Sequence, residues 1–419
     1  MDIPAAPVNP AAGQGMVRMI VRPSSVPIPP GSPRRTAPRP SHLRPPDYAD
    51  KFDDDTLFFD VFREGGRVVA VGPPLVNLVD ELPGWTFAAD GMPLRRPSIT
   101  TLDRSHRMRF DVPQSAGSLS LSTASETVAV PIGANLSSAF AGTRALMTLQ
   151  LDTDLDWVSD WVRWHVNAQG TDAVVMYDNG STRYPLTDLL ESISLPGIRS
   201  AAVVDWSFRY GPQGSDELPW DSDFTQYGAI EHARRRFLGQ AAGMLSIDID
   251  ELVYAKGGRT VYECAERSPE GFVLFEGTWA YTDPAWSAGR PRHADCTWTR
   301  PGDEATASKW CAIPARLPAR SQLIVHSAHG VSMPHPPIAY WHLRPISTHW
   351  KVDRSRSEHD AGAYRHSALL AEQMQRYLAD DGTPAPRPRD VPPSWLGRQL
   401  RRAGSLARRL RRRLPRRSR

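Results

Sequence analysis

The sequence predicts an α/β protein with a parallel sheet and crossover helices, preceded by a small β-rich domain. From Arg144 onward, strand-like and helix-like stretches alternate, which is typical of parallel strands joined by helices. Before Arg144, short runs of alternating apolar and polar residues indicate antiparallel β-structure. Both ends of the chain are rich in proline and arginine, which indicates tails without a packed core.

These changes in composition divide the 419 residues into four parts. We expect a disordered Pro/Arg-rich tail in residues 1–46 and a small β-rich accessory domain in 47–143. The α/β domain should occupy residues 144–380, and a Pro/Arg linker with a basic amphipathic tail should follow in 381–419. The β-rich domain could be a binding module or a structural cover, and both interpretations stay open.

Charge is distributed unevenly along the chain. The net charge of residues 1–46 is +5 and that of residues 391–419 is +11. Since the whole chain has a net charge of +4, the remaining residues have a net charge of −12. An acidic centre argues against a domain that binds specific nucleic acids. In residues 395–419, leucines at helical spacing beside the arginines are instead expected to bind an anionic membrane surface. A disordered tail that binds polyanions in general is the alternative.

The sequence contains no stretch of about 18 apolar residues that could span a bilayer, and no signal-type apolar segment begins it. We therefore expect a cytoplasmic protein, with peripheral attachment to the inner face of the membrane through its basic tail. The cysteines, Cys264, Cys296 and Cys311, lack the paired spacing of a zinc site or a disulfide framework.

The elements of the α/β domain are predicted from periodicity. Apolar runs predict strands at 145–151, 172–177, 200–205, 244–249 and 272–275, and apolar residues at helical spacing predict helices at 157–168 and 226–242. In the β-rich domain, Glu64-Gly65-Gly66 lies between two alternating runs and predicts a hairpin.

The run Ile247-Asp248-Ile249-Asp250-Glu251 follows an apolar strand. A period of two places Asp248 and Asp250 on one face and the isoleucines in the core. Two carboxylates at the end of a strand can hold Mn²⁺ or Mg²⁺, which bind substrate phosphates at their remaining positions. An acidic turn without a metal is the alternative interpretation.

A second polar cluster, Tyr177-Asp178-Asn179-Gly180-Ser181-Thr182, follows an earlier strand. The carboxyl ends of strands in α/β sheets are where ligands bind, and Asp178 and Asn179 could hydrogen-bond a ribose or a base. Gly180 permits a tight turn, and a turn without a ligand is the competing interpretation.

Together with Trp161-Val162-Arg163-Trp164-His165 and Gln226-Tyr227, these motifs resemble glycosyltransferase family 92 and its bacterial relatives in the family 2-like GT-A group. The resemblance covers about residues 144–355. It implies a GT-A fold with a Rossmann-like mixed sheet, a nucleotide-diphosphate sugar as donor, inversion at the transferred sugar and a Mn²⁺ or Mg²⁺ cofactor. We expect transfer of a hexose to a glycan or lipid acceptor in cell-envelope polysaccharide assembly.

The chain departs from this family after the first strand of the α/β domain. Where such enzymes often carry Asn-Glu, this chain reads Gln150-Leu151-Asp152-Thr153-Asp154-Leu155-Asp156. Asp152 and Asp154 are the candidates for contacts with the base or the ribose. Capping of the following helix is the alternative role of Asp154.

Further candidates follow the order in which similar enzymes place basic residues and a late histidine. Lys309 is expected near the diphosphate, and His326 is the candidate for a third metal ligand. A hydrogen-bonded surface residue is the alternative for His326. Arg344 and Lys351 lie in an aromatic and basic segment suited to stacking on a sugar and neutralising phosphate.

An inverting transfer also needs a carboxylate that removes a proton from the acceptor hydroxyl. Glu276 and Asp295 are the candidates, and a solvated acid without a catalytic role is the alternative for each. A metal-dependent phosphoesterase is the alternative enzyme class, but the sequence lacks a dense cluster of metal ligands near the start of the fold. A non-enzymatic binder acting through the arginine tail would leave the two motifs unexplained.

Overall fold

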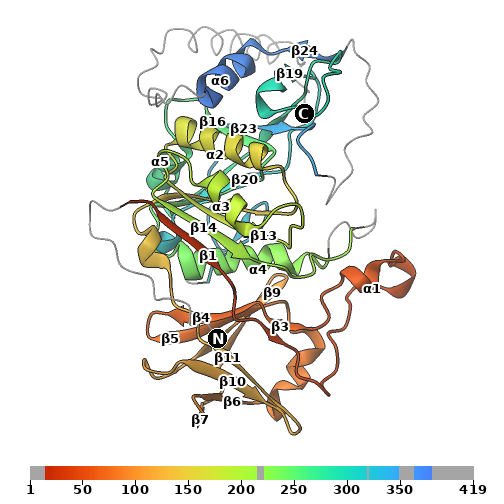
Figure 1. Cartoon of the computed structure of the whole chain (residues 1–419), viewed down its shortest axis with the longest axis vertical. Helices are drawn as coiled ribbons and strands as arrows, with labels where there is room; N and C mark the ends of the chain where they lie inside the picture. Colours follow the sequence, from red (N-terminus) through yellow and green to blue (C-terminus); the bar gives the residue numbers. More distant parts are fainter. Residues whose placement is uncertain (1–14, 215–220, 319, 349–362, 380–419) are drawn as a thin grey trace, which may run out of the picture.

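The computed structural model describes residues 15–214, 221–318, 320–348 and 363–379 (Figure 1). The protein has an α/β part with a mixed parallel and antiparallel sheet, and a β-rich part that lies below this sheet in Figure 1. The C-terminal tail, residues 380–419, lies outside the described residues, and its membrane binding stays a prediction. Within the described ranges, no helix is long and apolar enough to cross a membrane.

The main sheet has seven strands in the order β1-β14-β13-β12-β15-β20-β17. The first five are mutually parallel, and β20 runs antiparallel between β15 and β17. In sheet order, the strands span Val17–Val21, Ser200–Asp205, Ala173–Asp178, Arg144–Gln150, Gly243–Ser246, Lys309–Ala312 and Phe272–Phe275. All the predicted strands of the α/β domain are therefore present, and the one at 244–249 is shorter than predicted.

Each face of the main sheet packs on its own apolar core. Along β12, Leu146 belongs to one core and Met147 to the other, because strand side chains alternate between faces. Helices α2, α3, α5 and α6 share the first core and span Leu155–Gln169, Leu186–Ile193, Val261–Arg267 and Ala368–Leu378.

Helix α4 (Phe224–His232) continues into a π-helical turn, Ala233–Phe237, and packs in the second core. The helices predicted at 157–168 and 226–242 are thus confirmed in position, although the second ends before Ala242. Helix α3 was not predicted, because eight residues offer too little periodicity to recognise.

The disorder expected for residues 1–46 is wrong for residues 15–46. Strand β1 pairs with β14 in parallel, from Val17 opposite Ser200 to Val21 opposite Val204. Further on, the buried guanidinium of Arg39 binds both carboxylate oxygens of Asp221 at 2.9 Å. Local composition did not predict this ordered structure, because strand β14 and Asp221, which bind the segment, lie far along the chain.

A second, three-stranded sheet contains β16, β23 and β18, in that order, which span Glu251–Ala255, Ile338–Leu343 and Gly277–Ala280. Strand β23 is antiparallel to β16 and parallel to β18. Two short pairs complete this region: β21 (Gln322–Leu323) with β22 (Ala328–His329), and β19 (Trp298–Thr299) with β24 (Arg365–His366).

The β-rich part is a sandwich of two antiparallel sheets. One sheet has the order β4-β5-β9-β8, spanning Asp60–Glu64, Arg67–Gly72, Ser105–Phe110 and Ser98–Leu102. The other has the order β11-β10-β6-β7, spanning Thr127–Pro131, Ser118–Ser122, Thr86–Ala89 and Met92–Pro93. Apolar side chains of both sheets share one core. The predicted hairpin is confirmed as β4–β5.

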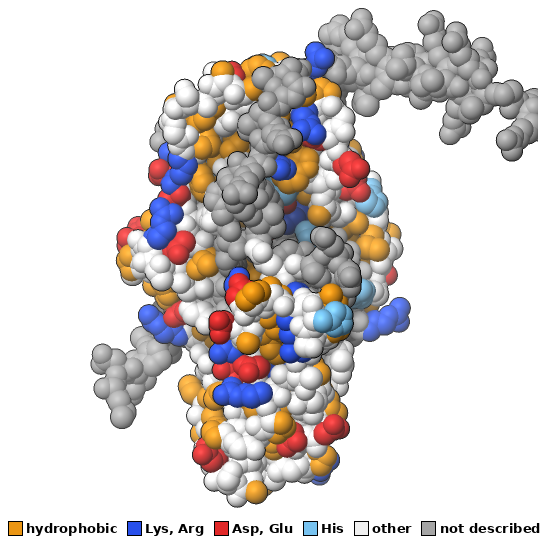
Figure 2. All heavy atoms as spheres, turned by 90° about the vertical axis from the view of Figure 1, so that its right-hand side faces the viewer, with side chains coloured by type: hydrophobic (Ala, Val, Ile, Leu, Met, Phe, Trp, Pro, Cys, Tyr) orange, Lys and Arg blue, Asp and Glu red, His pale blue; other side chains and the backbone are white. Residues whose placement is uncertain are grey.

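Charged side chains are mixed on the face of the molecule shown in Figure 2. Among the described residues of this face, acidic and basic groups are interspersed around the middle of the molecule rather than separated by sign. The acidic charge of the central residues is therefore not concentrated in one area of this face.

Candidate active site

The candidate site lies at the carboxyl ends of the parallel strands. In sequence, β12 is followed by β13 and β14 on one side of the sheet, whereas β15 lies on its other side. The strand order therefore reverses between β12 and β15, and ligands of open α/β sheets bind in the crevice at such a reversal. The residues that follow β12, β13 and β15 are the first to consider.

The strand that leads to the two aspartates ends earlier than predicted. Strand β15 ends at Ser246, and the backbone N–H of Glu251 donates to the carbonyl oxygen of Asp248 at 3.0 Å, which closes a turn. The chain turns here because its next strand, β16, pairs with β23 in the other sheet. Burial still alternates as predicted, with Ile249 buried and Asp248 and Asp250 partly exposed.

A buried histidine supports this turn. Nε2 of His293 lies 2.9 Å from the carbonyl oxygen of Ile249, between the two aspartates. A carbonyl can only accept, so Nε2 donates. Burial lowers the pKa of His293, which keeps the imidazole neutral. Nδ1 of His293 lies 3.8 Å from the carboxylate of Asp160 on helix α2.

Lys309, the first residue of β20, places a buried cation between two carboxylates. Its Nζ lies 2.5 Å from Oδ2 of Asp248 and 2.9 Å from Oε2 of Glu251. Burial alone would lower the pKa of Lys309, but the two negative charges outweigh burial and raise that pKa above its usual value. The ammonium group is therefore charged at neutral pH, and it binds Asp248 and Glu251 together.

Asp250, Glu251 and His342 form a group of side chains that could hold a metal ion. Each offers one ligand atom, and these atoms lie within 4.8 Å of one another. Nε2 of His342 lies 3.1 Å from Oδ2 of Asp250, and its Nδ1 lies 3.8 Å from Oε1 of Glu251. Glu251 and His342 are direct partners in the β16–β23 register, so their side chains share one face of the small sheet.

The ring of His342 is fixed from the other side by Trp279. These residues are partners in the β23–β18 register, and their rings stack with centroids 4.0 Å apart. The imidazole is therefore held between an indole ring and two carboxylates.

The donor set fits Mn²⁺ or Mg²⁺. Carboxylate oxygens suit both ions, and the imidazole nitrogen favours Mn²⁺ of the two. Burial raises the pKa of Glu251, although the charge of Lys309 opposes this effect. A buried carboxylate that resists ionisation would be stabilised by a dication beside it.

Asp178 and Asn179 tie the loops after β12, β13 and β14 together. The buried carboxylate of Asp178 accepts hydrogen bonds from the side chain of Gln150 and, at 2.9 Å, from the backbone N–H of Ser181. Burial raises the pKa of Asp178. Nδ2 of Asn179 donates to the carbonyl oxygens of Trp206 and Phe208, each at 2.8 Å. Asp178 and Asn179, which were predicted to contact a ribose or a base, therefore stabilise the loops at this edge of the sheet.

Asp152 and Asp154 lie in the loop between β12 and α2. Asp152 adopts a left-handed backbone with φ of 48°, and its Oδ1 accepts the backbone N–H groups of Thr182 (2.8 Å) and Arg183 (3.0 Å). Asp154 precedes α2, but its side chain makes no capping hydrogen bond there. Its carboxylate instead binds the guanidinium groups of Arg183 and Arg290. The structure therefore gives the alternative capping role of Asp154 no support.

The structure brings His326 to a different place from the metal-site group. His326 is exposed, and its Nδ1 lies 3.0 Å from the carbonyl oxygen of Ser308, the residue before Lys309. It lies between the two-residue strands β21 and β22. His342 occupies the position beside Asp250 that the sequence analysis assigned to His326.

Of the other candidates, Glu276 and Arg344 directly flank strands of the small sheet. Glu276 is exposed and directly precedes β18, and the carboxylate of Asp295 accepts the backbone N–H of Arg292 at 2.7 Å. The guanidinium carbon of Arg344 lies 5.5 Å from the ring centre of Trp279. Lys351 lies outside the described residues.

The pair of His342 and Glu251 was not predicted from the sequence. The signal was present, since Glu251 follows the two aspartates and His342 lies in an apolar strand-like run. Neither residue type indicates a site alone, however, and only the pairing of β16 with β23 makes them neighbours.

Comparisons with known proteins give little further information. No family model and no curated protein matches the sequence. Among solved structures, the chain is similar to one described as the apo structure of the bifunctional glycosyltransferase WbbM, with 12% identity and a TM-score of 0.24. The match covers 38% of this chain and 26% of that chain, so the chain spans about a quarter of that protein. A similarity at this TM-score carries no argument about fold or function.

Proposed function

We propose that this protein is a metal-dependent glycosyltransferase of the GT-A type. It moves a hexose from a nucleotide-diphosphate sugar to a glycan or lipid acceptor, with inversion, in cell-envelope polysaccharide assembly. The observation that carries the proposal is the group of Asp250, Glu251 and His342 beside the reversal of strand order in the main sheet. Carboxylate ligands can hold a divalent ion that binds the diphosphate, and the crevice at a reversal of strand order is where open α/β sheets bind their ligands.

A divalent ion at this group would supply positive charge against the charge that develops on the departing diphosphate. Asp250 and His342 are the ligands we assign to it, and Glu251 is the third. Asp248 is paired with Lys309 and contributes by holding the turn. Lys309 is already paired with two carboxylates, so Arg344 and Lys351 are the cations we assign to the diphosphate. The loops around Asp152, Asp154, Asp178 and Asn179 form the side on which the nucleotide binds.

The base that removes the proton from the acceptor hydroxyl is Glu276 in this proposal. Its carboxylate is exposed and belongs to the residue directly before β18, the strand that carries Trp279 beside His342. Asp295 is the weaker candidate, because its carboxylate already accepts a backbone N–H group.

The proposal is tested by incubating the protein with UDP- and GDP-sugars and Mn²⁺ or Mg²⁺. We expect one donor to be hydrolysed slowly in a metal-dependent way, and to raise the melting temperature. A protein that ignores every nucleotide sugar but hydrolyses simple phosphoesters with the same metals would instead be a phosphoesterase.

The variant Asp250→Asn tests the assigned site. It keeps the shape of the side chain but removes its charge, so we expect intact folding and at least a hundredfold loss of turnover, about 3 kcal/mol of transition-state stabilisation. Chelation of the metal should have the same effect. Asp111→Asn, at a surface pair with Arg67, is the matched control. Metal-stimulated transfer at a normal rate by Asp250→Asn would refute the assignment.

A further inference from the structure

Asp250, a ligand that we assign to the metal, lies in an irregular turn between the two sheets. Strand β15 ends at Ser246 and β16 begins at Glu251, so residues 247–250 belong to neither strand. A metal site holds its ion well only if each ligand is oriented in advance, and a turn orients its side chains less precisely than a strand does. The contacts that hold the backbone of this turn therefore decide where the carboxylate of Asp250 points.

Both peptide groups beside Asp250 are held by hydrogen bonds. The carbonyl oxygen of Asp250 accepts the backbone N–H of Leu343 at 2.7 Å, and Leu343 directly follows His342 on β23. The carbonyl oxygen of Ile249 belongs to the peptide group on the other side of Asp250 and lies 2.9 Å from Nε2 of His293. Because peptide groups are planar, fixing both of them fixes the φ and ψ of Asp250 and the direction of its Cα–Cβ bond.

The hydrogen bond from His293 is a firm one. The side chain of His293 is fully buried, with 0% of its surface exposed. A buried N–H group that loses its acceptor gains no water in exchange, so the loss costs free energy. The imidazole therefore keeps the carbonyl oxygen of Ile249 as its partner, and the turn cannot shift without breaking this bond.

Arg292 fixes the backbone from which His293 projects. His293 begins the short 3₁₀ turn His293–Asp295, and Arg292 directly precedes this turn. Nε and Nη2 of Arg292 lie 2.9 and 2.8 Å from the two carboxylate oxygens of Asp160 on helix α2. Such a two-point contact fixes the orientation of the guanidinium group as well as its position.

A further contact with helix α2 lies one residue earlier. Nε1 of Trp157 donates to the carbonyl oxygen of Pro291 at 2.9 Å. Trp157 and Asp160 are three residues apart on α2, so they lie on the same face of the helix, and both are buried. Residues 291–293 are therefore attached to a helix of the first core, and His293 connects that helix to the turn that carries Asp250.

We infer that His293 is a positioning residue of the proposed metal site. By holding the peptide group between Ile249 and Asp250, it directs the carboxylate of Asp250 toward the divalent ion, and the contact of Arg292 with α2 keeps the imidazole in place. His293 itself touches neither the metal nor the substrate. The inference rests on the metal site of the proposed function.

The variants His293→Leu and His293→Gln test the inference as a pair. Leucine fills the space but cannot donate, whereas glutamine carries an amide N–H that can replace Nε2. The EPR signal of free Mn²⁺ measures metal binding without any nucleotide sugar. We expect the Kd for Mn²⁺ to rise about tenfold or more in His293→Leu, as for other groups that orient metal ligands, and to stay within about threefold of the parent in His293→Gln.

A merely structural role predicts a different pattern. Both variants would then have lower melting temperatures but the same Kd for Mn²⁺ as the parent. The rate of sugar transfer gives a second readout, because the inference predicts that His293→Leu regains most of its rate when the Mn²⁺ concentration exceeds the new Kd. A rate that stays low at every Mn²⁺ concentration would overturn the inference.

Arg292→Leu keeps the inference testable if His293→Leu does not fold. The side chain of Arg292 is 44% exposed, and Asp160 keeps another cation nearby, since Nη1 of Arg163 lies 3.1 Å from its Oδ1. The fold should therefore survive the loss of Arg292. We expect a smaller rise in the Kd for Mn²⁺, about three- to tenfold, because His293 keeps its hydrogen bond but loses the anchor of its backbone.

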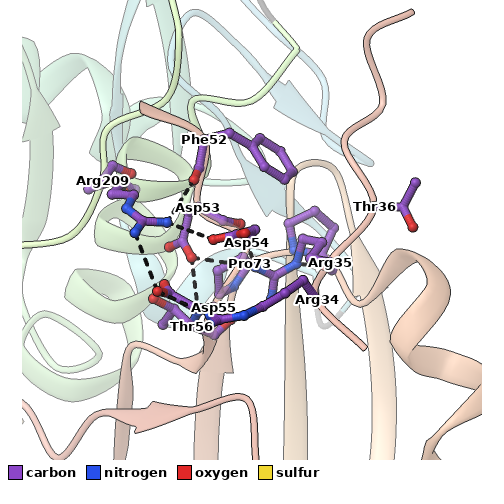
Figure 3. Close-up of polar contacts among 12 residues, drawn as sticks. Arg34, Arg35, Thr36, Phe52, Asp53, Asp54, Asp55, Thr56, Pro73 and Arg209 are labelled. Carbon is purple, nitrogen blue, oxygen red and sulfur yellow. Dashed lines mark hydrogen bonds and ion pairs between the residues drawn. The ribbon is translucent and has the colours of Figure 1, made fainter. Parts of the chain in front are cut away.

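Arg209→Leu is the matched control. Figure 3 shows Arg209 directed toward Asp54 and Asp55. Its Nη1 lies 2.6 Å from Oδ1 of Asp54, and its Nη2 lies 3.4 Å from Oδ2 of Asp55. The side chain of Arg209 is 41% exposed, so it matches Arg292 in exposure and in its pairing with carboxylates. This variant should leave the Kd for Mn²⁺ unchanged.

The metal-binding data separate the inference from the proposed function. Values of Kd for Mn²⁺ within about twofold of the parent in both His293→Leu and Arg292→Leu would overturn the inference and leave the proposed function standing. A parent protein that binds Mn²⁺ but transfers no sugar would refute the proposed function, and a raised Kd in the variants would still support the positioning role. A parent protein that binds no Mn²⁺ would refute both.

Discussion

Lys309 is the single residue on which the geometry of the candidate site depends most. It is the only cation whose contacts join Asp248 to Glu251 among the ion pairs of the described residues. Glu251 is almost fully buried, so its charge is tolerated only next to an opposite charge. Lys309 therefore neutralises Asp248 and Glu251 beside the group that we assign to a divalent metal.

Replacing Lys309 with methionine should destabilise the metal-free protein by roughly 3–5 kcal/mol, because one cation is lost beside two carboxylates. Mn²⁺ should then restore more stability to the variant than it adds to the parent, since Glu251 has lost the cation that neutralised it in the parent. Thermal melting with and without Mn²⁺ measures both effects. Lys256→Met, at an exposed lysine, is the control. Equal metal-induced shifts in the variant and the parent would contradict this prediction.

Among the elements, helix α4 joins the sandwich to the main sheet. A Cβ atom placed on Gly228 would lie 2.4 Å from Cε2 of Phe59. The ring of Phe59 is itself packed against Trp206 and Phe208, with centroid distances of 5.1 and 4.7 Å. The close approach of α4 to the N-terminal part therefore depends on the absence of a side chain at residue 228.

Gly228→Ala should lower the free energy of unfolding by about 1–3 kcal/mol, the usual cost of overpacking a core. Alanine gains about 1 kcal/mol in helix propensity, but the clash with a ring that cannot move outweighs this gain. Urea unfolding measures the difference. Gly84→Ala introduces a Cβ with no atom within 4 Å and should have little effect. A more stable Gly228→Ala variant would show that α4 and the sandwich can separate.

For the molecule as a whole, buried histidines determine the response to acid. Burial lowers the pKa of His106 to about 4 and that of His165 to about 3, from a usual value of 6.5. The folded state therefore binds these protons less readily than the unfolded chain. The stability that these neutral rings contribute is complete above pH 6.5 and is lost as the pH falls toward the folded-state pKa values.

The free energy of unfolding should accordingly fall by about 1.4 kcal/mol per pH unit for each of these histidines below pH 6.5. Urea unfolding at pH 7, 6 and 5 measures the slope. His106→Gln should reduce the slope by the share of one histidine, whatever its effect on stability at pH 7. A free energy of unfolding that stays constant from pH 7 to pH 5 would contradict the burial of neutral histidines.

The sequence alone determined the α/β character, most strand and helix positions and the alternation of Ile247, Asp248, Ile249 and Asp250 between core and surface. These features follow from periodicity, which is a property of neighbouring residues. It also singled out Asp250, whose carboxylate lies beside Glu251 and His342.

Only the tertiary structure decided which distant residues meet. The place of β1 beside β14, of His342 opposite Glu251 and of Arg104 against Asp223 depends on strand pairing and on contacts between residues separated by many positions in the sequence. Such contacts leave no periodic trace in either partner, because each one is stabilised by the fold that brings the two segments together.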